Sequence, residues 1–178
     1  MRKNTKKIEN LKIGATLIEL IIYSALLIFI SIFAINSVLV INSALVKIRL
    51  NRRININGEQ VMQKLFREIR FAKDINASST FGVNPGDISL KTFVSPTDST
   101  EIDADFYISG GRLMFKKGAA APLILTEPNI AITNFLFQQI TASSTSKAIK
   151  IELGLGTGNQ KFAASSTFYG TAILRGSY

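Results

Sequence analysis

The sequence predicts an α+β protein in which a long N-terminal α-helix packs on a small antiparallel β-sheet. Three observations predict this class. Residues 15–46 form an apolar run whose single charged residue is Glu19, and residues 47–74 repeat apolar side chains at a helical period. From residue 75 onward, short β-branched and aromatic runs alternate with turn residues, which is typical of antiparallel strands joined by short connections.

Residues 1–14 form a basic leader that ends in Gly14 and carries five basic residues against one acidic residue. A secretory signal peptide would place its small-residue cleavage site after the apolar region. Here the small residues Gly14 and Ala15 come before the apolar region. Cleavage between them would remove the charges and keep the hydrophobic helix.

Residues 15–46 form a hydrophobic transmembrane or assembly segment. At about 1.5 Å per residue, a helix of this length exceeds a hydrocarbon core of about 30 Å. Its later part contains Asn36, Ser37, Asn42 and Ser43. We therefore expect that part to be buried against protein rather than lipid.

Residues 47–74 continue the helix in amphipathic form, with one apolar stripe and basic residues on the other faces. The stripe consists of Leu50, Ile54, Gly58, Val61, Leu65, Ile69 and Ala72. Gly58 weakens the helix by about 1 kcal/mol relative to alanine but allows another element to approach closely. The stripe is the expected cover for one face of the sheet.

Residues 75–178 form a β-rich globular head. Strands are predicted at residues 88–94, 102–108, 113–115, 123–126, 130–140, 148–155 and 168–175, with a Gly110-Gly111 hairpin. The string Ala-Ser-Ser-Thr occurs at 77–80, 142–145 and 164–167 and predicts polar loops; glycosylated surface loops are the alternative. The glycine-rich stretch 154–158 predicts a turn, because no helix follows it as in a nucleotide site.

The net charge of +9 is unevenly distributed along the chain. Residues 1–14 and 15–74 each carry +4, whereas residues 75–178 carry +1. Basicity therefore belongs to the membrane end, where it attracts anionic lipid. Histidine and cysteine are both absent, which excludes disulfides, thiol catalysis and Cys/His metal sites. We expect neither an enzyme nor a cofactor.

Four acidic residues are weak candidates for Ca²⁺ ligands. Glu101, Asp103 and Asp105 alternate along a predicted strand and share one face, with Asp98 nearby. The spacing lacks the signature of a calcium loop. An ordinary solvated strand face is the favoured interpretation, and we predict no metal site.

The segment Gly14-Ala15-Thr16-Leu17-Ile18-Glu19-Leu20 resembles the processing segment of type IV pilin-like proteins, the family of pilins, minor pilins and pseudopilins that form filaments. The resemblance covers about residues 1–45, and the helix-then-sheet order extends it loosely. It implies that a prepilin peptidase cuts after Gly14 and that Ala15 becomes an N-methylated terminus. Because no proline precedes Pro85 and no disulfide can form, the chain is closer to minor pilins or pseudopilins than to major pilins.

The resemblance also gives Glu19 a role in assembly. An unpaired carboxylate inside a bilayer costs about 2.5 to 3.5 kcal/mol, so intramembrane acids usually have a partner. Cleavage would create an α-amino group on Ala15 that is largely charged near neutral pH. In the family, this amine on a neighbouring subunit is the proposed partner of the glutamate. The alternative is an interfacial glutamate in an ordinary signal anchor.

The resemblance implies a single-pass protein of the bacterial cytoplasmic membrane, with the leader cytoplasmic and the head outside. An assembly ATPase and a platform protein would then move it into a pilus or pseudopilus with other subunits. Basic residues flank the span on both sides, so the orientation rests on the resemblance. A signal-anchored binding domain that does not polymerise is one alternative, and a DNA-capture pilin is another. The near-neutral head counts against nucleic acid, because phosphate binding needs clustered Lys and Arg.

Overall fold

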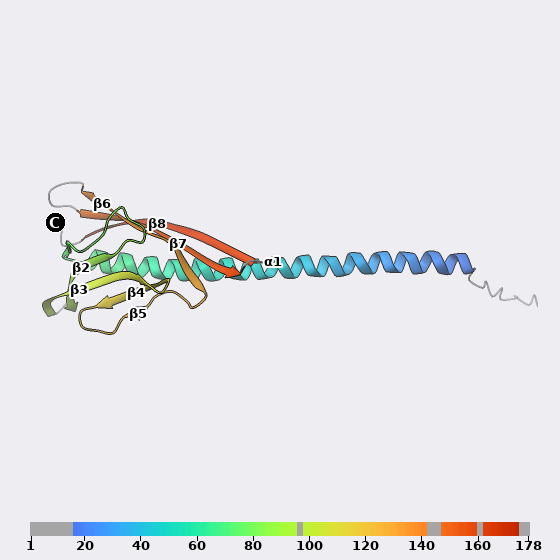
Figure 1. Ribbon diagram of the computed structural model, residues 1–178, viewed down its shortest axis with the longest axis horizontal. Helices are drawn as coiled ribbons and strands as arrows, with labels where there is room; N and C mark the ends of the chain where they lie inside the picture. The colour runs from blue at the N-terminus through green and yellow to red at the C-terminus, as the bar shows by residue number, and fades with distance from the viewer. Residues whose placement is uncertain (1–15, 96–97, 142–146, 160–161, 175–178) are drawn as a thin grey trace, which may run out of the picture. The chain divides into compact units, whose positions relative to one another are not determined.

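A computed structural model describes residues 16–95, 98–141, 147–159 and 162–174 (Figure 1). Over these residues, one α-helix is followed by eight strands. The elements are α1 (Leu17–Phe71), β1 (Asp74–Ile75), β2 (Ile88–Ser95), β3 (Asp98–Ser109), β4 (Arg112–Lys117), β5 (Leu123–Ile124), β6 (Ile130–Thr141), β7 (Lys147–Asn159) and β8 (Phe162–Ile173). The predicted α+β class is confirmed.

The chain divides into two compact units, Met1–Ala44 and Leu45–Tyr178. The first unit holds the N-terminal part of α1, and the second holds the rest of α1 together with the strands. In the part of the chain that the structure describes, α1 is long and apolar enough to cross a membrane, and none of its most apolar window is buried within the chain. The predicted membrane-spanning helix is consistent with this finding.

The serine hydroxyls of the N-terminal part of α1 are bonded inside the helix. Each donates to a backbone carbonyl oxygen three or four residues earlier, at distances of 2.7 to 2.9 Å; the donors are Ser24, Ser31, Ser37 and Ser43. These hydroxyls therefore need no partner outside the helix, which suits an apolar environment. Asn36 and Asn42 are exposed within the single chain, so their predicted burial requires a neighbouring molecule.

The predicted apolar stripe on the second part of α1 is confirmed. Its buried members within α1 are Ile54, Gly58, Val61, Leu65 and Ile69; Leu50 is partly buried, and Ala72 is buried directly after the helix ends. The predicted end of the helix at residue 74 is wrong, because α1 ends at Phe71. The N–H of Ala72 donates to the Ile69 carbonyl, which tightens the last turn, and the N–H of Lys73 already donates to the sheet at Lys91.

The first sheet has the strand order β1-β2-β3-β4-β5, with antiparallel neighbours throughout. Ser109 pairs with Arg112 across the turn between β3 and β4. Gly110 and Gly111 have φ values of +58° and +73°, which two-residue hairpins with a matching twist require. The predicted Gly-Gly hairpin is therefore confirmed.

The remaining strands form a second antiparallel sheet in the order β6-β7-β8, so the prediction of a single sheet is wrong. The segment 164–167 belongs to β8 rather than to a loop, because it pairs with β7 without a break in register. The segment 77–80 lies between β1 and β2, as expected of a loop. The segment 142–145 lies outside the described residues.

The glycine-rich stretch 154–158 lies inside β7, so the predicted turn is also wrong. Strand β6 bulges between Ile132 and Asn134. A Cβ atom on Gly154 would lie 2.6 Å from Thr133 Oγ1 at this bulge. The glycine therefore serves a close approach of the two strands rather than a change of chain direction.

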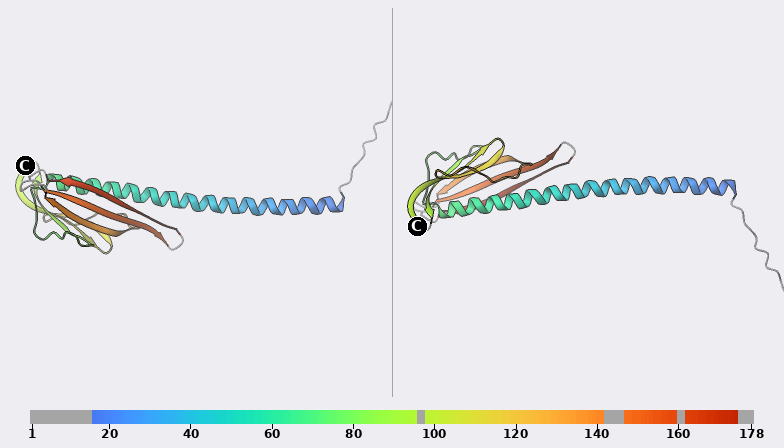
Figure 2. Two further views of the ribbon diagram at one scale, coloured as in Figure 1. Left: turned by 90° about the horizontal axis from the view of Figure 1, so that it is seen from above. Right: turned by 90° about the horizontal axis from the view of Figure 1, so that it is seen from below.

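The core lies between the second part of α1 and the two sheets, and the views in Figure 2 show β6, β7 and β8 alongside this part of the helix. Two pairs of phenylalanines stack within it, with ring centroids 4.7 Å apart for Phe106–Phe115 and 4.6 Å apart for Phe135–Phe137. A Cβ atom on Gly58 would lie 2.2 Å from the Phe168 ring. The close approach predicted at Gly58 is confirmed.

An ion pair joins the two sheets. Lys147 Nζ in β7 donates to Asp74 Oδ1 in β1 at 2.6 Å. This hydrogen bond, followed by one from the Ile75 N–H, lowers the pKa of Asp74 below its usual 3.8. Because the pKa of Asp74 is lowered in the folded state, its ionised form stabilises the fold at pH values above the usual pKa of aspartate. That stabilisation is lost as the pH falls through the pKa of the folded state.

Asp74→Asn is therefore expected to lower the free energy of unfolding at pH 7 by about 0.5 kcal/mol, because both side chains are partly exposed. The difference between the variant and the wild type should shrink as the pH falls below about 4. Urea unfolding of the detergent-solubilised chain across this range measures it, with Lys147→Met as the matched variant. A deficit that stays constant down to low pH would contradict the ion-pair explanation.

Candidate functional site

Thr16 caps the N-terminus of α1. The Glu19 N–H donates to Thr16 Oγ1 at 3.4 Å, and the Leu20 N–H donates to the Thr16 carbonyl at 3.2 Å. The order Thr-x-x-Glu is that of a capping box, a local pattern from which this cap was predictable. Gly14 and Ala15 lie outside the described residues, so cleavage and N-methylation there stay predictions.

Glu19 has a hydrogen-bond partner one helical turn away. The Tyr23 hydroxyl donates to Glu19 Oε1 at 3.0 Å. The sequence analysis missed Tyr23, although its spacing of four residues places the two side chains on one helix face. Glu19 also lies in the first turn of α1, where a negative charge is favoured by about 0.3 to 1 kcal/mol.

These local contacts leave Glu19 able to accept a further donor. An ionised carboxylate has about four lone-pair sites, and the Tyr23 hydroxyl uses one of them. Glu19 is half-buried, whereas its neighbours Ile18 and Leu20 are 67% and 65% exposed. The site therefore consists of a preoriented carboxylate at the start of a helix whose apolar side chains are exposed. Such a site can hold a cation.

Apolar side chains surround the helix that follows Glu19. Phe29, Phe33 and Val40 are 70%, 71% and 68% exposed within the chain. A helix that is hydrophobic on all faces requires lipid or other helices around it. The surface that follows the carboxylate therefore suits contact between chains as well as contact with a membrane.

The weak calcium candidates do not form a metal site in the part of the chain that the structure describes, where no three acidic side chains are grouped to hold an ion. Each instead accepts its own hydrogen bond: Asp98 from the Thr100 N–H, Glu101 from Lys73, Asp103 from Asn76 and Asp105 from Ser89. The Lys73 ammonium lowers the pKa of Glu101, and the Thr100 N–H lowers the pKa of Asp98. These contacts explain the carboxylates as members of a polar strand face.

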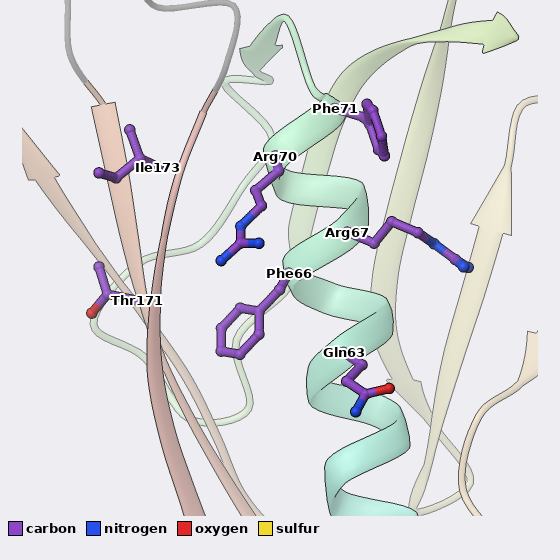
Figure 3. Close-up of a pocket in the computed structure, with 7 residues that line it drawn as sticks. All are labelled: Gln63, Phe66, Arg67, Arg70, Phe71, Thr171 and Ile173. Atoms are coloured by element: carbon purple, nitrogen blue, oxygen red, sulfur yellow. The ribbon is translucent and has the colours of Figure 1, made fainter. Parts of the chain in front are cut away.

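A groove of about 650 Å³ lies between the end of α1 and β8 (Figure 3). It is lined by Gln63, Phe66, Arg67, Arg70 and Phe71 of α1 and by Thr171 and Ile173 of β8, and we call it the α1–β8 groove. The sequence analysis missed this groove. No local pattern could have predicted it, because its two walls are about a hundred residues apart in the chain.

Comparisons with protein-family models, with curated proteins and with solved structures found no match to this chain. The assignment of a function therefore depends on the chain's own features. These are the segment at residues 14–20, the carboxylate of Glu19 and the exposed apolar helix that follows it.

Proposed function

We propose that this chain is a structural subunit, a minor pilin or pseudopilin, of a filament like a type IV pilus or a type II secretion pseudopilus. One observation carries the proposal. Glu19 lies four residues after Ala15, at the capped start of a helix whose apolar side chains are exposed within the chain. An ordinary membrane anchor has no need of a carboxylate in this position.

The proposed assembly has two chemical steps. A prepilin peptidase hydrolyses the peptide bond between Gly14 and Ala15, which releases the basic leader and creates an α-amino group. That ammonium group then pairs with Glu19 of a neighbouring subunit, while Tyr23 holds the carboxylate in place. Pairing offsets the cost of about 2.5 to 3.5 kcal/mol for a lone carboxylate in a bilayer.

The exposed helix surface supplies the rest of the association. Side chains such as Phe29 and Phe33 gain van der Waals contacts when helices pack together in the filament. The platform protein and the assembly ATPase would move the chain from the membrane into this packing. The head formed by residues 75–178 would then lie on the outside of the filament.

Cross-linking tests the proposal, because the natural chain has no cysteine. A double variant, Ile28→Cys with Val38→Cys, places two thiols on exposed positions of α1. In its own cells, treatment with a bis-maleimide is expected to give a ladder of oligomers larger than a dimer, since each subunit of a filament contacts several others.

Each single-cysteine variant is the matched control and is expected to stop at the dimer. A double variant that also stops at the dimer would contradict the filament proposal. That result would instead favour a signal-anchored binding domain that does not polymerise.

A further inference from the structure

The second sheet has one covered edge and one open edge. At the β6 edge, the N–H groups of Gly82 and Gly86 donate to the carbonyls of Phe137 and Phe135 at 2.8 and 2.7 Å. Asn84 Oδ1 accepts from the Phe135 N–H at 3.0 Å. The opposite edge is β8, and among the described strands its only partner is β7.

The outward groups of β8 follow from its register. The Leu174 N–H donates to the Lys147 carbonyl at 3.0 Å, at the end of the β7–β8 ladder. In an antiparallel pair, alternate residues bond to the same neighbour. The intervening residues therefore direct their N–H and C=O groups away from β7; they are Ala163, Ser165, Thr167, Tyr169, Thr171 and Ile173.

Strand β8 lacks the devices that usually protect an open edge. Native edges carry charged residues, proline or bulges that prevent pairing with another chain. Phe162–Ile173 contains no charged residue and no proline, and its pairing with β7 has no register shift. The edge is therefore regular enough to accept another strand.

The α1–β8 groove lies beside this edge and carries positive charge. Figure 3 shows the side chains of Phe66 and Arg70 extending from α1 toward β8. Over the described residues, no salt bridge involves Arg70. The Arg67 side chain extends to the other side of α1, so Arg70 supplies the charge that faces β8. The apolar part of the groove includes Ile173, which is 48% exposed.

We propose that the β8 edge and the α1–β8 groove bind an extended acidic segment of another protein, which adds a fourth strand to the second sheet. The outward backbone groups of β8 would supply the main-chain hydrogen bonds. A carboxylate on the added strand would meet Arg70, and its apolar side chains would meet Phe66 and Ile173. This site lies within the unit Leu45–Tyr178 and does not depend on filament assembly.

Charge selects the occupant. A second copy of β8 could supply the backbone groups, but Phe162–Ile173 has no carboxylate for the Arg70 guanidinium group. Arginine forms bidentate hydrogen bonds with carboxylates, so an acidic segment matches both the edge and the groove. A partner segment with alternating acidic and apolar residues fits this surface best.

Fluorescence polarisation tests the proposal with the full chain in a non-ionic detergent. The probe is a short labelled peptide in which glutamate alternates with valine. It is expected to bind at least about tenfold more tightly than the same peptide with lysine in place of glutamate. Equal binding of the two peptides, or no binding of the glutamate peptide, would overturn the proposal.

Two further measurements separate the edge from the groove. Arg70→Glu is expected to reverse the preference between the peptides. Thr171→Pro removes an outward N–H of β8 and should leave the hydrogen bonds between β7 and β8 in place. It is expected to weaken binding of the glutamate peptide, whereas the control Thr171→Val should bind that peptide normally. Thermal unfolding verifies that each variant is folded.

A backbone-methylated version of the glutamate peptide provides a test that needs no variant. Its methylated nitrogens cannot donate to the β8 carbonyls, so its affinity is expected to fall by at least about tenfold. Undiminished binding of this peptide would exclude strand addition. The oligomeric state without peptide gives a further test. If the chain forms a dimer and Thr171→Pro dissociates that dimer, a second copy occupies the edge and the proposal is overturned.

Discussion

Replacing Glu19 with alanine is expected to leave the chain in the membrane but to reduce its incorporation into filaments by at least about tenfold. Without Glu19, the Ala15 ammonium group of the neighbouring subunit stays unpaired among apolar helices, and a lone charge inside a membrane costs about 2.5 to 3.5 kcal/mol. A difference of 1.4 kcal/mol corresponds to a factor of about ten in an equilibrium constant. The cut after Gly14 should remain largely intact. The ratio of the variant in sheared filaments to the variant in membranes measures the effect.

Matched variants separate charge from local structure. Glu19→Gln keeps an acceptor for the Tyr23 hydroxyl but removes the charge, so it should fail as Glu19→Ala does. Tyr23→Phe keeps the charge and removes the local hydrogen bond, and it should incorporate better than either Glu19 variant. Normal incorporation of Glu19→Ala would count decisively against the pairing mechanism.

Phe135→Ala is expected to lower the free energy of unfolding of the head by about 3 to 5 kcal/mol. The Phe135 side chain is fully buried and packs edge-to-face on Phe137, with ring centroids 4.6 Å apart. Its backbone hydrogen bond to Asn84 does not depend on the side chain, so the substitution removes packing alone. Because small domains have a total stability of about 5 to 15 kcal/mol, the variant head should be marginally stable.

Urea unfolding of the detergent-solubilised chain, followed by circular dichroism, measures this loss. Tyr169→Ala is the matched control, since Tyr169 is 64% exposed and its truncation should change the free energy of unfolding by about 0.5 kcal/mol or less. A loss below about 1 kcal/mol for Phe135→Ala would show that the core does not pack as described.

Local patterns predicted the helix well. The spacing of Ile54, Val61, Leu65 and Ile69 follows the helical period, and all four side chains are buried. The end of α1 was missed by three residues, because the pairing of Lys73 with Lys91 in the sheet competes with continuation of the helix. The local pattern of the helix carries no information about the distant strand with which the next residue pairs.

Non-local features of the head were predicted less well. A strand has the same alternating pattern whichever sheet it joins, so the split into two sheets was not predictable from periodicity. Gly154 looked like a turn residue, but it faces the β6 bulge at Thr133, a contact between distant segments. The α1–β8 groove was not predictable either, because its walls also come from distant segments of the chain. By contrast, the partners Thr16 and Tyr23 of Glu19 are local and could have been found from spacing.

The N-terminus of the protein extracted from the membranes of its own cells tests the central claim most directly. Mass spectrometry of the intact chain and of its N-terminal peptide locates both the cut and any methyl group. We expect a chain that begins at Ala15 and carries one methyl group on its α-amino nitrogen. A chain that retains Met1, or that is cut at another position, would contradict the proposal that this protein is a pilin-like filament subunit.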